Sequence, residues 1–191
     1  MKSVWVVRHG ETEWSRVMRH TGRADLPLTE LGRAQAARLA PRLERETFAR
    51  VLVSPLLRAR QTCEIAGFDA RAEVWPELAE WDYGAVEGKT EAEFCATTPG
   101  WNLWVDGGPG GESVAEFSAR VGGVVARILG AGDGNTLVFA HGHMLRVMAA
   151  RWVGAAPELG RSLSLGPTSL GRLGCSERGQ SIELWNDDRH L

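Results

Sequence analysis

The sequence predicts an α/β protein in which helices cover both faces of a central, mostly parallel sheet, a three-layer α/β/α sandwich. Short apolar runs rich in β-branched residues alternate along the 191 residues with longer segments of helical periodicity. No repeat or low-complexity linker interrupts this alternation. Residues 1–191 are therefore expected to form a single domain.

Four apolar runs are expected to form strands. Each is short and ends at a polar or turn-forming residue, which is typical of a buried strand. These runs are Val4 to Val7, Val51 to Val53, Val74 with Trp75, and Thr136 to Ala140. The segment from Ser169 to Leu184 is expected to add one or two strands.

Five segments have the apolar spacing or the end signals of helices. They span residues 29–44, 57–66, 90–97, 113–129 and 141–153. Thr29 can cap the first of them, and Gly67 should stop the second. The glycine-rich run 106–111, within the segment from Trp101 to Gly111, predicts a loop or lid.

Composition and charge narrow the classes of function. The net charge of -2 at pH 7 predicts no bulk attraction to nucleic acid or to an anionic membrane surface. The apolar run before Arg8 is too short for a signal peptide or a membrane span. Cys63, Cys95 and Cys175 form no Cys-x-x-Cys pair, so reduced thiols and a cytoplasmic location are expected.

Polar side chains follow three of the expected strands. Arg8-His9-Gly10 follows the first strand, Ser54 and Arg58 follow the second, and His141 follows the strand that ends at Ala140. In sheets of this class, ligands bind beyond the carboxyl ends of the strands. These side chains are therefore expected to meet at one site.

The residue types suit phosphoryl chemistry. Neutral imidazole is a nucleophile toward phosphorus, and nearby arginines would keep His9 neutral near pH 7. Arg58, in the first turn of a helix, can place two donors on a phosphate, and Gly10 allows an anion to approach the backbone. Glu80 lies beside aromatic residues and can supply a proton to a leaving alkoxide. Each feature by itself has an ordinary structural explanation.

Two other motifs give weaker signals. His141 and His143 have the spacing of a metal pair, but no cluster of carboxylate or cysteine ligands accompanies them. The run from Gly84 to Thr90 is similar to a phosphate-binding loop, but it is one residue too short and no apolar strand precedes it. Neither a metal site nor a nucleotide site is favoured.

Together, the motifs resemble the histidine phosphatase superfamily, which includes the cofactor-dependent phosphoglycerate mutases. The resemblance covers nearly the whole chain, with the motifs in the family's order, and implies a phosphoglycerate mutase-like fold. The motifs are Arg8-His9-Gly10-Glu11-Thr12, Thr21-Gly22 with Asp25 to Thr29, Ser54 to Thr62, Glu80-Trp81-Asp82-Tyr83-Gly84, Gly111-Glu112-Ser113, and Ala140-His141-Gly142-His143.

The resemblance implies a role for each catalytic residue. His9 becomes a phosphohistidine, while Arg8, Arg58 and His141 clamp the phosphoryl oxygens. Glu80 donates a proton to the leaving group and later activates water. No metal or other cofactor is expected, because the arginines supply the positive charge.

The resemblance also implies a substrate side, with the expected binding residues Ser15, Thr21, Gly22, Tyr83 and Gly142. The family usually has Asn in place of Ser15, and the shorter serine leaves the phosphate contact at this position open. Four tryptophans, Trp14, Trp81, Trp101 and Trp104, are candidates for the pocket wall. For Trp101 and Trp104, hydrophobic packing under the lid is an equal alternative.

Hydrolysis is favoured over phosphoryl transfer. Between Tyr83 and Glu112, Lys89 is the only basic residue, so a bisphosphate intermediate would have little to retain it. The expected activity is a phosphatase for small phosphate monoesters such as sugar phosphates, closest to the acid phosphatase and sugar bisphosphatase branch. A cofactor-dependent phosphoglycerate mutase and a non-catalytic phosphate-binding module are the alternatives. The expected partner is a small phosphate ester, and a homodimer is left open.

Overall fold

The computed structural model describes residues 2–191, and its centre is a six-stranded sheet in the order β3-β2-β4-β1-β5-β6. The strands are β1 (Lys2–Arg8), β2 (Phe48–Val53), β3 (Ala72–Val74), β4 (Asn135–Ala140), β5 (Leu170–Ser176) and β6 (Gly179–Asp187). The first four are parallel, and β5 and β6 form an antiparallel hairpin beside β1. A strand is present at each predicted place, although the third is Ala72–Val74 and leaves out Trp75.

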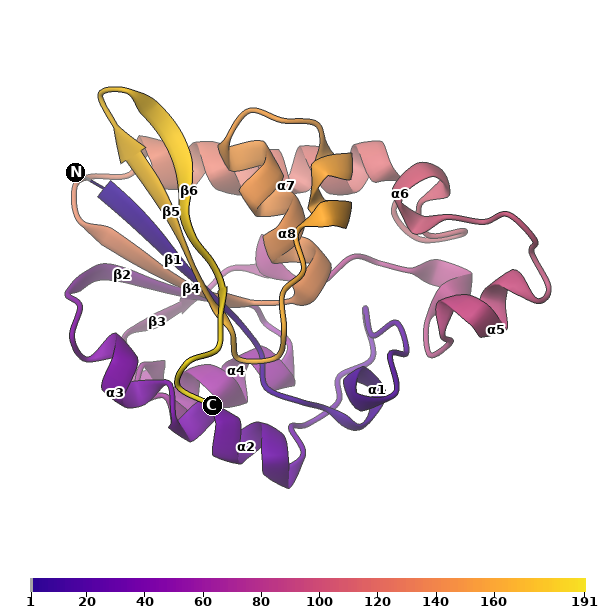
Figure 1. Ribbon diagram of the computed structural model, residues 1–191, viewed down its shortest axis with the longest axis horizontal. Coiled ribbons are helices and arrows are strands. Elements are labelled where there is room, and N and C mark those ends of the chain that lie inside the picture. The colour runs from indigo at the N-terminus through magenta and orange to yellow at the C-terminus, as the bar shows by residue number, and fades with distance from the viewer. Residues whose placement is uncertain (1) are drawn as a thin grey trace.

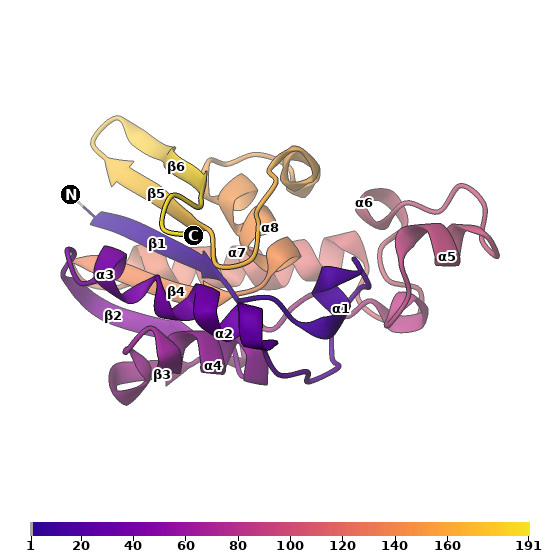
Figure 2. The ribbon, with the colours of Figure 1, turned by 60° about the horizontal axis from the view of Figure 1, so that its bottom comes forward.

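Helices cover both faces of the sheet, as predicted. They are α1 (Glu13–Arg16), α2 (Glu30–Ala37), α3 (Ala40–Leu43), α4 (Leu57–Ile65), α5 (Glu91–Cys95), α6 (Leu103–Asp106), α7 (Val114–Gly130) and α8 (Gly142–Trp152). Helices α2, α3 and α4 lie on one face, and α7 and α8 lie on the other (Figure 1). The turned view separates the same layers and shows α5 and α6 together at one end of the molecule (Figure 2).

The two faces of the sheet have separate apolar cores. Along β1, Val4 and Val6 belong to the core under α7 and α8, whereas Trp5 and Val7 belong to the core under α2 to α4. Successive side chains of a strand point to opposite faces, and a strand covered on both faces is apolar at every position. This is why the central strands are continuous apolar runs in the sequence.

One helix that was predicted to be continuous is interrupted in the structure. The expected helix over residues 29–44 is divided into α2 and α3, although Thr29 caps α2 by accepting a hydrogen bond from the Gly32 N–H. Pro41 lies in the first turn of α3. A proline has no N–H for the helical ladder and disfavours helical geometry in the preceding residue, so the helix restarts there.

The segment 101–111, predicted as a loop or lid, contains one short helix as well. Its α6 helix is capped by the side chain of Asn102, and Gly107 ends it with a left-handed φ of 70°. The glycine-rich remainder is irregular, as predicted. Among residues 2–191, no helix has both the length and the apolar character needed to cross a bilayer.

The strand register brings the polar strand ends together. In the parallel pairs, Arg8 lies opposite Ala140, and Val53 lies opposite Phe139. His9, Ser54 and His141 are therefore the first residues beyond the carboxyl ends of three neighbouring strands. This edge is where ligands bind in sheets of this class.

Candidate active site

His9 is held as a neutral imidazole with one nitrogen free for reaction. Its side chain is only 5 % exposed, and its backbone N–H donates to the Ala140 carbonyl at 3.0 Å. Nδ1 lies 2.7 Å from the Gly10 carbonyl, which can only accept, so Nδ1 carries the proton and Nε2 has the lone pair. Burial, then the charges of Arg58 and Arg8, hold the pKa of His9 well below its ordinary value.

The backbone after His9 packs tightly against α2. Gly10 N–H donates to the Thr62 hydroxyl at 3.0 Å, which ties this turn to α4. A Cβ added to Gly10 would lie 2.5 Å from the Gly32 carbonyl oxygen. A glycine is therefore required here for close approach, and α2 and α4 together fix the direction of His9.

Arg58 joins the helix α4 to the substrate-side loop. Its fully buried guanidinium donates from Nη1 to Ala24 O at 2.8 Å, and from Nη2 to Thr21 O and Gly22 O at 2.8 and 3.1 Å. Its Nε–H donates to His141 Nδ1 at 3.1 Å. A guanidinium has five N–H groups, so one N–H on Nη1 has no hydrogen-bond partner among the described residues.

His141 lies beside His9, with 5.3 Å between the centroids of the two rings. Because its Nδ1 accepts from Arg58, the proton of the neutral ring is on Nε2, which donates to the Ser54 hydroxyl at 2.6 Å. Burial and the charge of Arg58 lower the pKa of His141 well below its ordinary value. The expected contact of His141 with a phosphoryl oxygen stays a prediction, since the Nε2–H is shared with Ser54 here.

Arg8 keeps a donor without a partner. Its Nη1 donates to Leu165 O at 2.6 Å, while its buried Nε–H has no hydrogen-bond partner. Gly142 lies against this group, because an added Cβ would be 3.4 Å from Arg8 Nε. The backbone N–H of Thr168 donates to the carbonyls of Arg8 and His9 at 3.0 and 3.2 Å. Leu165 and Thr168 thus hold the side chain and the backbone of Arg8 in place. The unpaired Nε–H of Arg8 suits an anion.

Glu80 is held by the first turn of α8. Its side chain is 8 % exposed, and Oε1 accepts from the backbone N–H groups of Trp81 and Met144, both at 2.9 Å. Oε2 accepts from His143 N–H at 3.0 Å. The first N–H groups of a helix lack intrahelical partners and attract negative charge. The first turn of α8, whose N-cap is His141, therefore holds the carboxyl group of Glu80.

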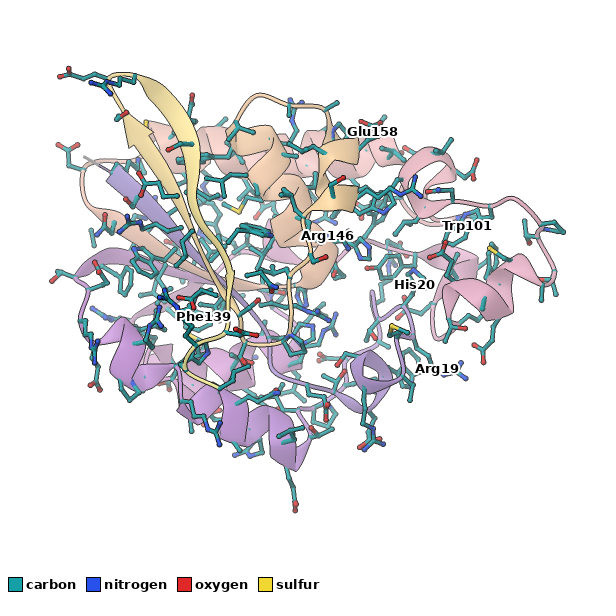
Figure 3. The ribbon with its side chains drawn as sticks, in the orientation of Figure 1. Arg19, His20, Trp101, Phe139, Arg146 and Glu158 are labelled. Carbon is teal, nitrogen blue, oxygen red and sulfur yellow. The ribbon has the colours of Figure 1, made fainter. Side chains whose placement is uncertain are left out.

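A cluster of aromatic and imidazole rings lies next to Glu80. Burial, then the charge of Glu80, raise the pKa of Tyr83 well above its ordinary value, and its hydroxyl shares a hydrogen bond of 2.7 Å with His143 Nδ1. His20 packs on the edge of Tyr83 with centroids 4.8 Å apart. Figure 3 shows His20 between Trp101 and Arg146 in that view.

His20 and Arg146 were not predicted from the sequence, yet both lie close to His143 in this cluster. Arg146 donates to the carbonyls of Gly160 and Arg161 and lies over the Trp104 ring, 4.9 Å from its centroid. The spacing of Arg146 from His143, one turn along α8, was a usable signal for this face of the helix.

The predicted substrate-side residues contribute mostly through their backbone. Thr21 and Gly22 offer carbonyls to Arg58, and Gly22 N–H donates to the Glu87 carboxylate at 2.9 Å. The Ser15 hydroxyl accepts from Thr12 N–H at 2.9 Å and takes part in the capping box of α1. A contact between Ser15 and phosphate stays a prediction.

Three of the tryptophans are core residues. Trp81 is fully buried and stacks on Phe117 with centroids 4.3 Å apart, so its prediction as a pocket wall is wrong. Trp101 and Trp104 belong to the same buried core, which favours the packing alternative. Trp14 remains half-buried, and its ring lies against Gly88.

The buried histidines make stability sensitive to acid. The pKa values of His9, His141 and His143 are lowered mainly by burial, whereas each titrates near 6.5 in an unfolded chain. Below pH ~6.5 the unfolded chain binds more protons than the folded one, so the free energy of unfolding falls as pH falls. Each group contributes up to ~1.4 kcal/mol per pH unit.

Urea unfolding at a series of pH values measures this effect. We expect a nearly constant midpoint above pH ~7 and a steep fall between pH ~6.5 and ~5. A midpoint that stays level down to pH ~5 would contradict the burial of these histidines as neutral groups.

Comparison with known proteins identifies the family. The model of the histidine phosphatase superfamily (branch 1) matches residues 4–188. The chain belongs to the histidine phosphatase superfamily. The predicted resemblance is therefore confirmed, and membership supports phosphatase activity.

Three relatives illustrate the range of this histidine phosphatase family. An acid phosphatase of Mycobacterium tuberculosis is 38% identical over 88% of this chain and 84% of its own. A sedoheptulose 1,7-bisphosphatase of Saccharomyces cerevisiae is 34% identical over 78% of this chain and 66% of its own. A probable phosphoglycerate mutase GpmB of Enterobacter sp. is 30% identical over 100% of this chain and 95% of its own.

A solved structure has the same fold as this histidine phosphatase. It is the product of the open reading frame Rv3214 of Mycobacterium tuberculosis, with a TM-score of 0.91 and 32% sequence identity. The alignment covers 97% of each chain. Phosphoglycerate mutase-like architecture, predicted from the motifs, is thus confirmed.

Proposed function

We propose that this protein hydrolyses phosphate monoesters of small molecules through a phosphohistidine on His9, without a metal ion. The observation that carries the proposal is the state of the His9 ring. Its Nδ1–H is fixed on Gly10 O, and its Nε2 lone pair is free. Arg8 and Arg58 each keep an N–H that protein groups leave unpaired, which suits the oxygens of a phosphoryl group.

The reaction proceeds in two displacements. Nε2 of His9 attacks phosphorus while the bond to the leaving oxygen breaks, and Glu80 gives that oxygen its proton. Glu80 then takes a proton from water, which attacks phosphorus and breaks the N–P bond. Phosphate leaves, and His9 and Glu80 return to their starting states. Arg8 and Arg58 stabilise the negative charge on the oxygens that are not exchanged.

Hydrolysis is favoured over a mutase reaction because Lys89 and Arg19, which could bind the second phosphate of a bisphosphate intermediate, already contact other side chains. The Lys89 ammonium lies 5.3 Å from the centroid of the Phe94 ring. Arg19 is paired with Glu93 through two hydrogen bonds of 2.7 and 2.9 Å. A second phosphate would have to displace one of these contacts. Relatives named as an acid phosphatase and a sedoheptulose 1,7-bisphosphatase support the proposal of phosphatase activity on phosphorylated sugars.

Phosphate release tests the proposal. We expect the protein to hydrolyse p-nitrophenyl phosphate, and members of a panel of sugar phosphates, at equal rates with and without EDTA, because the arginines supply the charge a metal would bring. Activity lost in EDTA and restored by a divalent cation would overturn the metal-free mechanism. Interconversion of phosphoglycerates that needs 2,3-bisphosphoglycerate and outruns phosphate release would identify a mutase instead.

A further inference from the structure

The segment that carries Glu80 has almost no regular structure of its own. Residues 79–83 lie between two 3₁₀ turns, Pro76–Leu78 and Gly84–Val86, and contain neither helix nor strand. Buried backbone groups outside helices and strands must find other partners, and side chains commonly provide them. The position of Glu80 therefore depends on the groups that bind this backbone.

Arg120, on α7, binds the segment through its carbonyls. Nη1 donates to Glu77 O at 2.7 Å and to Ala79 O at 2.8 Å, and Nη2 donates to Glu80 O at 3.2 Å. The other two donors are taken by Glu112, at 2.7 Å from both Nε and Nη2. All five N–H groups of this guanidinium thus have protein partners.

Glu112 binds the residues immediately after Glu80. Its Oε2 accepts from Asp82 N–H at 3.0 Å, and its own N–H donates to Asp82 O at 2.9 Å. Its carbonyl accepts from the Trp81 indole at 2.9 Å. Arg120 and Glu112 therefore hold the backbone on both sides of Glu80, while α8 holds its carboxylate.

We propose that Arg120 and Glu112 are positioning residues for the proton donor Glu80. They act through the backbone of residues 77–82 and fix the place from which the carboxyl delivers its proton. The inference rests on the function proposed above, in which Glu80 protonates the leaving oxygen. Neither residue takes part in holding the phosphoryl group, which is the work of His9, Arg8 and Arg58.

The geometry requires an arginine in particular. Lysine carries the same charge, but its three donors are on one nitrogen and cannot bridge Glu112 and three carbonyls at once. Arg120→Lys therefore preserves the charge and loosens the segment. A displacement of ~1 Å in a reacting group can cost ~10²-fold in rate. The loss should be confined to the step in which Glu80 transfers a proton.

Two substrates with different leaving groups distinguish a positioning role from a general loss of structure. An alkoxide needs a proton as it departs, whereas p-nitrophenolate departs without one. The kcat/KM value reports only the steps up to departure of the leaving group, so it excludes the water step that both substrates share. We expect Arg120→Lys and Glu112→Gln each to lower kcat/KM for glycerol 2-phosphate by ~10- to 100-fold, and for p-nitrophenyl phosphate by ~3-fold or less.

Arg127→Lys is the matched control on the same helix. Arg127 is 55 % exposed and lies over the Trp75 ring, with its guanidinium 3.7 Å from the centroid. Its replacement should leave the ratio of the two kcat/KM values unchanged. Urea midpoints of every variant verify folding, and if Arg120→Lys does not fold, Glu112→Gln decides the question.

The last measurement combines Arg120→Lys with Glu80→Gln and compares the ratio of the two kcat/KM values with that of Glu80→Gln alone. If Arg120 acts through Glu80, then Arg120→Lys should change the ratio no further once Glu80 is replaced. An equal loss for both substrates in Arg120→Lys and Glu112→Gln would overturn the positioning role. A ratio unchanged by Glu80→Gln itself would instead overturn the assignment of Glu80 as proton donor, and that result is read independently of Arg120.

Discussion

Replacing His9 by alanine is expected to lower kcat/KM for p-nitrophenyl phosphate by at least ~10⁴-fold, because the reaction loses its nucleophile. Among residues 2–191, the histidine ring nearest to His9 is not free to replace it. The neighbouring ring of His141 has Nδ1 engaged by Arg58 and Nε2 engaged by Ser54. The His9 variant should still bind phosphate, since Arg8 and Arg58 remain.

Trapping of the covalent intermediate provides the direct measurement. A radiolabelled phosphate ester, quenched in base, should leave label on the wild-type protein and none on His9→Ala. His190→Ala removes a histidine from the end of the chain, where its ring contacts Thr168 O, and serves as the control that should keep the label. Label retained by His9→Ala would refute His9 as the nucleophile.

Replacing Arg58 by alanine is expected to have two large effects at once. The free energy of unfolding should fall by about 3–5 kcal/mol, because four acceptors lose their buried, charged donor. Turnover should fall by at least ~10²-fold, because one side of the phosphoryl group loses its positive charge. Urea unfolding measures the first effect, and kcat/KM for p-nitrophenyl phosphate measures the second.

Arg60→Ala is the control for this variant. Arg60 lies on the same helix two residues later and is exposed. Its removal should change the free energy of unfolding by no more than ~0.5 kcal/mol and leave turnover intact. If Arg58→Ala proves as stable as Arg60→Ala, the loop carbonyls do not depend on Arg58 as the structure indicates.

The sheet could be predicted because its signals are local. Apolar runs such as Val4 to Val7 mark strands buried on both faces, and the polar residues directly after them mark one edge of the sheet. His9 and His141 directly follow such strands, and Arg58 lies in the helix after a third, so the sequence alone predicts that they meet. The break between α2 and α3 was missed because helical periodicity outweighed Pro41.

The supporting contacts could not be predicted from the sequence. Arg120 binds the carbonyls of Glu77, Ala79 and Glu80, and every residue type has a carbonyl, so the pairing leaves no mark in the chain. The sequence also does not show whether the polar groups of Ser15 and His141 bind other protein groups or a ligand, because this depends on the geometry of the fold. The candidate catalytic residues could therefore be predicted from the sequence, whereas the residues that orient them could not.

The attachment of Arg58 to main-chain oxygens bears on how such an enzyme diversifies. Thr21, Gly22 and Ala24 meet the guanidinium only through carbonyls, so exchanging the side chain of Thr21 or Ala24 removes no acceptor of Arg58, although Thr21 would lose the bond from its hydroxyl to Arg19 O. Arg23 between them is 82 % exposed. Gly22 alone is constrained, since a Cβ there would lie 2.5 Å from Trp81 O. Changes in the shape and polarity of this loop at positions 21, 23 and 24 are thus expected to be tolerated without loss of the acceptors that hold Arg58.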